Sequence, residues 1–195
     1  GLEMVLRNGT PVHTYIYVDS DPAARALAEH RVQQLRAQFP HLLPATAVER
    51  SFALLPHDVR QIRQSALVQL SEQLPRQWLV VGGWPCQDLS PAGSSKGLRG
   101  NRSSLFEELL QIVGTLQQVQ KRLPPAYLLE NVAFQYNWRD TAISKQDFEH
   151  VCSAIGTPAC LDAAQFGSYA HRLRNFWTNL CDSQQLLAAA ANVSR

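Results

Sequence analysis

The spacing of apolar residues along the chain changes between a helical period and short β-rich runs, and these changes mark its predicted elements. Apolar residues recur at helical spacing in several stretches that begin or end at a capping residue, glycine or proline. The predicted helices span 2–6, 22–39, 62–74, 104–123 and 148–155. Runs rich in β-branched, aromatic or aliphatic residues lie between them. The predicted strands span 13–18, 77–81, 126–132, 158–167 and 174–180, with a weak strand within 45–59.

Strands that alternate with helices over short connections predict an α/β fold with a mainly parallel sheet. The run 77–81 is continuously apolar, as expected of a strand buried on both faces of a parallel sheet, whereas the last two strands are expected to pair as an antiparallel edge. Ligands bind such sheets outside the carboxyl ends of the strands. Polar residues that follow strands are therefore expected to meet at one edge: Asp19, Asp58, Cys86 and Glu130.

Cys86 lies in GGWPCQDLS, where a strand passes into a glycine-rich loop. Pro85 fixes its own φ and restricts Trp84, so this loop has a constrained shape. A cysteine nucleophile needs thiolate character, which nearby cations promote, and Arg172 and Arg174 are candidates. The position favours a reactive cysteine over one that only fills the core as a small hydrophobe.

Two acidic residues at strand ends each allow two interpretations. Glu130 in LLENV is flanked by apolar residues, where a partly desolvated carboxyl has a raised pKa and can donate a proton. A structural carboxylate that accepts backbone hydrogen bonds is equally consistent with the pattern. Asp19 follows a predicted strand, the place of an acid that binds ribose hydroxyls, but it also fits a helix cap before Pro22.

Composition narrows the class of protein only a little. The chain has 195 residues and a net charge of +2, which suits one domain and gives no strong signal for nucleic acid. Its four cysteines form no CxxC pair, and no Cys/His group has zinc-finger spacing. No apolar run in the sequence is long enough to cross a membrane.

Three stretches in this order resemble the DNA (cytosine-5)-methyltransferases: GGWPCQDLS, ENV at 130–132 and HRLRNFWTNL at 171–180. The resemblance covers 1–180 as part of the catalytic domain, with 181–195 as a helix-prone tail that leads toward a target-recognition region. It implies a Rossmann-like fold that depends on S-adenosylmethionine. The stretch 171–180 is most similar to the de novo branch of animals and its phage and plant relatives, whereas 92–106 is more similar to bacterial and phage members.

The resemblance implies a catalytic role for each matching residue. Cys86 would attack C6 of a cytosine flipped out of DNA, and the methyl group of S-adenosylmethionine would then pass to C5. Glu130 would contact N3 and the exocyclic amine of the base, and Asn131 would hold that strand end. Arg172 and Arg174 would orient the ring and steady the charge near Glu130 and Cys86.

The same resemblance implies S-adenosylmethionine as cofactor and DNA as partner. The residues that it assigns to the cofactor are Gly1, Asp19, Ser20, Asp58 and Leu105. Those that it assigns to the substrate or DNA, besides Asn131, are Pro85, Gln87, Ser90, Lys96, Arg99 and Arg102. The loop 90–102 has glycines for mobility and basic side chains for phosphates, although a solvated linker would have the same composition.

Relative to the family pattern, a first strand and its glycine-rich turn are expected before Gly1, and a target-recognition region after Leu180. We therefore expect the chain to belong to a longer protein, or to act with a protein partner, and to bind cofactor weakly by itself. Three alternatives stay open: a tRNA cytosine-5 methyltransferase, a non-catalytic regulatory scaffold, and a Cys–His hydrolase that uses His171. The expected compartment is the nucleus in a eukaryote and the cytoplasm or nucleoid otherwise.

Overall fold

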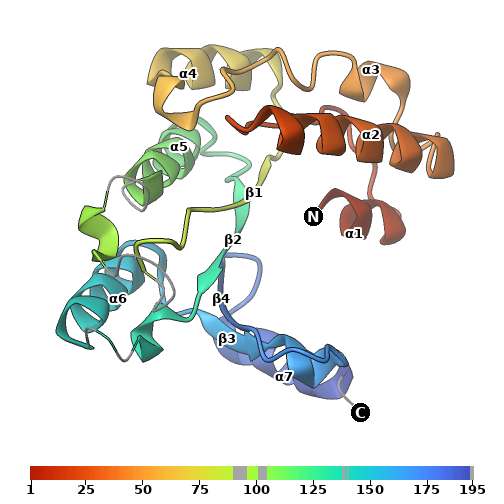
Figure 1. Cartoon of the computed structure of the whole chain (residues 1–195). Coiled ribbons are helices and arrows are strands. Elements are labelled where there is room, and N and C mark those ends of the chain that lie inside the picture. Colours follow the sequence, from red (N-terminus) through yellow and green to blue (C-terminus); the bar gives the residue numbers. More distant parts are fainter. Residues whose placement is uncertain (90–95, 101–104, 138, 140, 194–195) are drawn as a thin grey trace. The chain divides into compact units, whose positions relative to one another are not determined.

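The computed structural model describes residues 1–89, 96–100, 105–137, 139 and 141–193. The chain forms two compact units, Gly1–Ala66 (unit 1) and Leu67–Arg195 (unit 2), whose elements are labelled in Figure 1. The elements of unit 1 are α1 (Leu2–Arg7), α2 (Pro22–Gln38), α3 (Ala45–Val48) and the 3₁₀ turn η1 (Val59–Gln61).

The helices of unit 1 follow the sequence pattern closely. The Asp21 side chain accepts a hydrogen bond from the Ala23 N–H at 2.9 Å, and Pro22 occupies the first helical position, so α2 begins where its cap and its proline place it. The apolar stripe of α2 buries Val32 and Leu35. These residues pack with Leu6 of α1 and with Leu43 in a small core.

The strands predicted within unit 1 are not formed, which corrects the prediction for 13–18 and 45–59. Residues 13–18 form neither helix nor strand. Two of their N–H groups bond to separate places: Tyr15 donates to the Ala47 carbonyl and Tyr17 to the Ser51 carbonyl, at 2.8 and 2.9 Å. The carbonyl groups that accept these bonds belong to a segment that contains α3 and turns. No β-ladder can therefore form between that segment and residues 13–18. β-forming side chains make an extended segment, but a strand also needs an extended neighbour.

Unit 2 contains a mixed sheet and most of the helices. Its helices are α4 (Gln64–Gln73, which crosses the unit boundary), α5 (Leu105–Val119), α6 (Thr141–Ile155) and α7 (Ser183–Val193). Its strands are β1 (Leu79–Gly83), β2 (Ala126–Val132), β3 (Ala159–Asp162) and β4 (Leu173–Thr178). Short 3₁₀ turns complete it: η2 (Gly97–Arg99), η3 (Phe134–Tyr136) and η4 (Ala163–Phe166).

The strands form one sheet in the order β1-β2-β4-β3. β1 and β2 are parallel, with Gly83 opposite Glu130 in the register. β4 is antiparallel to both of its neighbours, β2 and β3. The predicted α/β fold and its antiparallel edge are therefore confirmed, and β2 has the predicted bounds.

Side chains along β2 point alternately to the two faces of the sheet, and the two faces differ in burial. Leu129 and its register partner Trp177 on β4 are fully buried, and both pack with Phe106 of α5 and Val151 of α6. Glu130, the next residue along, points to the opposite face. One face of the sheet therefore carries the hydrophobic core, and the other receives the side chains of the candidate site.

β1 differs from the prediction of a strand buried on both faces. Val80 packs against the core, but Leu79 and Val81 on the opposite face are 43% and 49% exposed. Among the described residues β1 pairs with β2 alone, so it forms one border of the sheet. At the other border α7 packs along β3, as Figure 1 shows in blue, so the helix-prone tail is indeed helical.

Candidate active site

The parallel pairing of β1 and β2 sends Cys86 and Glu130 out from the same edge of the sheet. Gly83, the last residue of β1, lies opposite Glu130, and Cys86 follows Gly83 by three positions. Cys86 is half-buried and carries a free thiol. The register thus places Glu130 and the residue three positions before Cys86 at the same level of the β1–β2 pair.

Glu130 forms an ion pair with Arg174 across the β2–β4 ladder. Val132 is the register partner of Arg174, so Arg174 lies diagonally from Glu130 on the same face, within reach of long side chains. The Arg174 Nε lies 2.8 Å from the Glu130 Oε1. The Glu130 side chain is 44% exposed, more than its apolar neighbours in sequence suggested, and the arginine partner removes the problem of an unpaired carboxylate.

Gly83 leaves room beside Glu130 that no other residue would leave. A Cβ at position 83 would lie 2.5 Å from the Glu130 carbonyl oxygen and 3.4 Å from its Oε2. Close pairing of β1 with β2 beside the glutamate therefore requires a residue without a side chain at position 83.

The segment around Cys86 is held by buried groups on both sides. The Trp84 ring packs against Phe106 and Trp177, with ring centroids 4.7 and 5.4 Å away. The Asn131 Nδ2 donates to the Trp84 carbonyl at 2.8 Å. Asn131 therefore holds the loop that carries Cys86. Its Oδ1 also accepts from the Val132 N–H at 2.7 Å, so it binds the end of its own strand as well.

Two further buried side chains bind this loop, and the sequence alone did not single them out. Asn137 donates to the Leu89 carbonyl at 2.9 Å, and the Asp147 carboxylate accepts from the Leu98 N–H at 2.7 Å. Each bond joins residues more than forty positions apart, and neither residue belongs to a recognisable motif. No local pattern could have found them.

Arg172 and Arg174 have different surroundings. The Arg172 side chain is exposed, and its backbone N–H donates to the Asp162 Oδ1 at 2.9 Å. The Asp162 Oδ2 lies 2.8 Å from the His171 Nδ1. This pairing and backbone N–H bonds hold the pKa of Asp162 below its usual range, so the carboxylate binds both residues that precede β4. Of the two predicted arginines, only Arg174 contacts Glu130.

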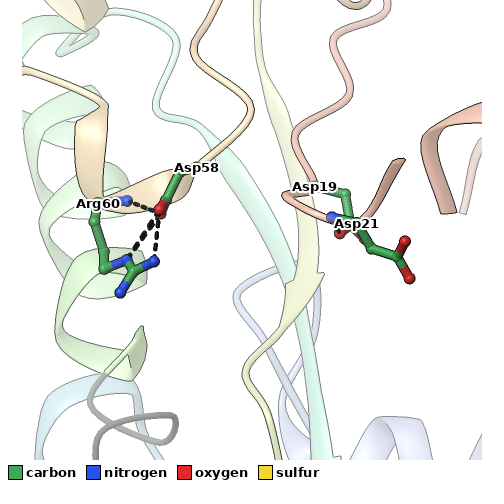
Figure 2. A network of polar contacts seen from close by, with 4 residues as sticks. All are labelled: Asp19, Asp21, Asp58 and Arg60. Carbon is green, nitrogen blue, oxygen red and sulfur yellow. Dashed lines mark hydrogen bonds and ion pairs between the residues drawn. The ribbon is translucent and has the colours of Figure 1, made fainter. Parts of the chain in front are cut away.

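The predicted acidic residues of unit 1 belong to separate sets of contacts (Figure 2). The Asp19 Oδ1 accepts from the Asp21 N–H at 2.9 Å, while its Oδ2 has a long contact of 3.4 Å with the Tyr17 hydroxyl. Both oxygens of Asp58 are bound by the Arg60 guanidinium, at 2.6–3.1 Å. These bonds hold the pKa of Asp58 below its usual range. Asp19 therefore keeps free acceptor capacity, and Asp58 has much less.

The remaining predicted residues are distributed over both units. Gly1 is the exposed N-cap of α1, Ser20 is exposed in the turn before α2, and Leu105 begins α5 and packs against the core of unit 2. Pro85 is half-buried, and three polar residues are exposed: Gln87, Lys96 and Arg99. Ser90 and Arg102 lie outside the described residues.

A half-buried cysteine at the end of a parallel strand, with a carboxylate–guanidinium pair on the neighbouring strands, defines a class of site. It combines a thiol, which can act as a nucleophile once deprotonated, with a carboxylate–guanidinium pair that can form charge-assisted hydrogen bonds. A sequence model of the family described as C-5 cytosine-specific DNA methylase matches residues 50–190, which include all of these side chains. The chain belongs to the C-5 cytosine-specific DNA methylase family.

Named relatives come from bacteria and a phage. The chain is 31% identical over 121 residues to the Type II methyltransferase M2.BsuMI of Bacillus subtilis, a match that covers 62% of the chain and 24% of the relative. It is 36% identical over 127 residues to the Type II methyltransferase M.FnuDI of Fusobacterium nucleatum, which covers 64% and 33%. The orphan methyltransferase M.SPRI of Bacillus phage SPR is 43% identical over 61 residues, or 31% and 12%.

The matched segments span about a quarter to a third of the length of the two relatives with the longest matches. The described part of the chain contains no helix that is both long enough and apolar enough to span a membrane.

Proposed function

We propose that this chain carries the catalytic residues of an enzyme that transfers a methyl group from S-adenosylmethionine to C5 of cytosine in DNA. The observation that carries the proposal is the Glu130–Arg174 ion pair at the strand edge from which Cys86 also leaves, within the part of the chain that matches the family. All three side chains lie in the stretches that resemble the family's motifs.

Each residue has a defined task in the proposed reaction. The Cys86 thiolate forms a bond to C6 of the cytosine, and the electrons of the C5–C6 double bond move toward C5 and the ring. Glu130 accepts a hydrogen bond from the exocyclic amine and binds a proton together with N3; the positive charge that develops on the protonated ring draws electron density from C6. Arg174 holds the Glu130 carboxyl in place. After methylation a base removes the C5 proton, the electrons re-form the double bond, and the C6–S bond breaks to return the thiolate.

The target carbon of cytosine lies inside the DNA duplex, so the base has to leave the stack before Cys86 can reach it. The exposed Lys96 and Arg99, which follow Cys86 closely in sequence, are suited to bind backbone phosphates on the strand that carries the base.

The residues of unit 1 fit a bound cofactor in part. S-adenosylmethionine supplies an electrophilic methyl group on a sulfonium centre. Asp19 fits a partner for ribose hydroxyls because its Oδ2 has only a long contact with Tyr17. Asp58 fits an adenine contact less well, since both of its oxygens already accept from Arg60, and that guanidinium would have to turn away first.

Covalent trapping tests the proposal. A pool of random-sequence duplexes with 5-fluorocytosine in place of cytosine is incubated with the full-length protein that contains this chain and with saturating S-adenosylmethionine. After methyl transfer C5 carries fluorine in place of the proton that must leave, so the C6–S bond persists. We expect a denaturation-resistant adduct whose peptide map places the base on Cys86.

Cysteine variants provide matched controls for the adduct. Cys86→Ser should form none, whereas Cys160→Ser should keep it, because Cys160 is also a free, half-buried thiol and lies on the far strand β3. No adduct from the full-length parent protein, or an adduct on another cysteine, would refute the proposal. The first of these results would favour the regulatory scaffold.

A further inference from the structure

We propose that Asn137 is a positioning residue for Cys86: its side-chain amide fixes the end of the Cys86 segment that Asn131 does not hold. The Cys86 segment is defined as residues 84–89. The inference deepens the proposed function and rests on Cys86 as the nucleophile.

The bond from Asn137 to this segment is buried and has a fixed direction. Asn137 is 3% exposed, and its Nδ2 donates to the Leu89 carbonyl at 2.9 Å. Its Oδ1 accepts from the Arg139 N–H at 3.1 Å. The acceptor end of the amide is therefore committed to the backbone of its own loop, which turns the donor end toward Leu89.

Asn131 binds the opposite end of the segment in the same way. Its Nδ2 donates to the Trp84 carbonyl at 2.8 Å, while its Oδ1 accepts from the Val132 N–H at 2.7 Å. Asn131 is the next-to-last residue of β2, directly after Glu130, and Asn137 follows the turn η3 that comes after this strand. The two amides fix the Cys86 segment with respect to Glu130.

Cys86 lies between the clamped carbonyls and is tied to the second one directly. The Leu89 N–H donates to the Cys86 carbonyl at 3.0 Å, and the Leu89 carbonyl receives the Asn137 amide. Trp84 and Leu89 are 5% and 2% exposed, so both ends are also anchored in the core, while Cys86 between them is half-buried. The backbone is fixed and the thiol remains accessible, as a nucleophile requires.

Asn179 provides a control with the same chemistry elsewhere in the sheet. Its Nδ2 donates to the Pro125 carbonyl at 2.9 Å, and its Oδ1 accepts from the Tyr127 N–H at 2.8 Å. This pair of bonds lies at the start of β2, the end opposite Glu130. Loss of the Asn179 amide should weaken unit 2 without loosening the Cys86 segment.

The first measurement does not depend on any enzymatic activity. Asn137→Asp keeps the shape and the acceptor for Arg139 but loses the donor to Leu89, and Asn137→Ala replaces it if the aspartate variant does not fold. Amide hydrogen exchange at Leu89 is compared in the parent, the Asn137 variants and Asn179→Asp. We expect exchange about tenfold faster in the Asn137 variants, the factor that corresponds to one buried neutral hydrogen bond. Asn179→Asp should leave it unchanged.

The second measurement tests the link to the reaction. The rate of adduct formation with 5-fluorocytosine DNA, corrected for the folded fraction, should fall about tenfold or more in the Asn137 variants and stay near the parent rate in Asn179→Asp. Unchanged Leu89 exchange, equal acceleration in Asn179→Asp, or faster exchange with an unchanged adduct rate would each overturn the inference. An adduct absent from the parent as well refutes the proposed function, while the exchange result still decides whether Asn137 fixes the segment.

Discussion

One added methyl group at Gly97 should lower the free energy of unfolding by several kilocalories per mole. Its φ is +67°, a conformation that residues with a side chain rarely adopt. A Cβ there would overlap the Asp147 carboxylate and lie 2.6 Å from the Ile143 Cγ2. Asp147 is 8% exposed and accepts from the Leu98 N–H, so the carboxylate has little room to turn away. Gly97→Ala must therefore either strain the backbone and break this bond or move α6.

The cost follows from these two contributions. The left-handed conformation costs about 1–2 kcal/mol for a residue with a Cβ. Loss of a hydrogen bond to a charged group costs roughly 1.5–3 kcal/mol. Gly97→Ala should therefore lower the free energy of unfolding by about 2.5–5 kcal/mol, which for a chain of this size corresponds to a fall in Tm of roughly 5–20 °C.

Unfolding by urea, followed by circular dichroism, measures the free energy of unfolding of each variant. Two other glycines serve as controls that separate the conformational cost from the cost of the lost hydrogen bond. Gly156 has a φ of +88°, and no atom of the described residues lies within 4 Å of the place that a Cβ would take, so Gly156→Ala should cost only the conformational part, about 1–2 kcal/mol. Gly114 lies inside α5 with equally open surroundings in the described part of the chain, so Gly114→Ala should stabilise by about 0.5–1 kcal/mol. If Gly97→Ala costs no more than Gly156→Ala, the carboxylate contact contributes nothing and the reasoning fails.

Three further changes have expected outcomes. Gly83→Ala places a Cβ 2.5 Å from the Glu130 carbonyl oxygen and should cost about 1–3 kcal/mol in thermal unfolding; a neutral effect would show that β1 can shift freely. His171 and backbone N–H groups lower the pKa of Asp162, so its contribution to stability is present above about pH 3.9 and is lost as the pH falls through the lowered value. In Asp162→Asn the urea midpoint should therefore fall less between neutral and acidic pH than it does in the parent. An equal fall in both proteins would contradict this. Burial raises the pKa of Tyr15 to about 12, so stability present below about pH 10 is lost between the two values. Tyr15→Phe should remove that loss, and a phenolate titration that shows Tyr15 ionising with the exposed tyrosines would refute it.

The sequence predicted best the elements whose signals are local. Asp21 and Pro22 mark the start of α2 because the cap acts on the first turn alone. β2 has the predicted bounds because its apolar run is short, buried and bounded by Pro125. The antiparallel edge was also predictable, since β3 and β4 are close in sequence.

Features that depend on distant partners could not be predicted in this way. Residues 13–18 are rich in β-formers, yet their hydrogen bonds go to a helical and turning segment thirty residues later, which no local pattern describes. In the site, the order of the motifs identified Glu130 and Arg174 as candidates. It could not show that Arg172 lies outside this ion pair and binds Asp162 through its backbone N–H. Asn137 carries no motif at all, because its partner Leu89 is set by tertiary packing.

The order of the strands has a consequence for how the site is assembled in time. β3 and β4 are joined by a short connection, so their pairing closes a small loop, whereas β1 reaches β2 only after α5 has crossed over between them. We expect the hairpin with Arg174 to form early and the β1–β2 pairing to form late. The Cys86 segment would then be among the last parts of the chain to fold. A folding intermediate would expose the Cys86 thiol before Asn131 and Asn137 fix the segment.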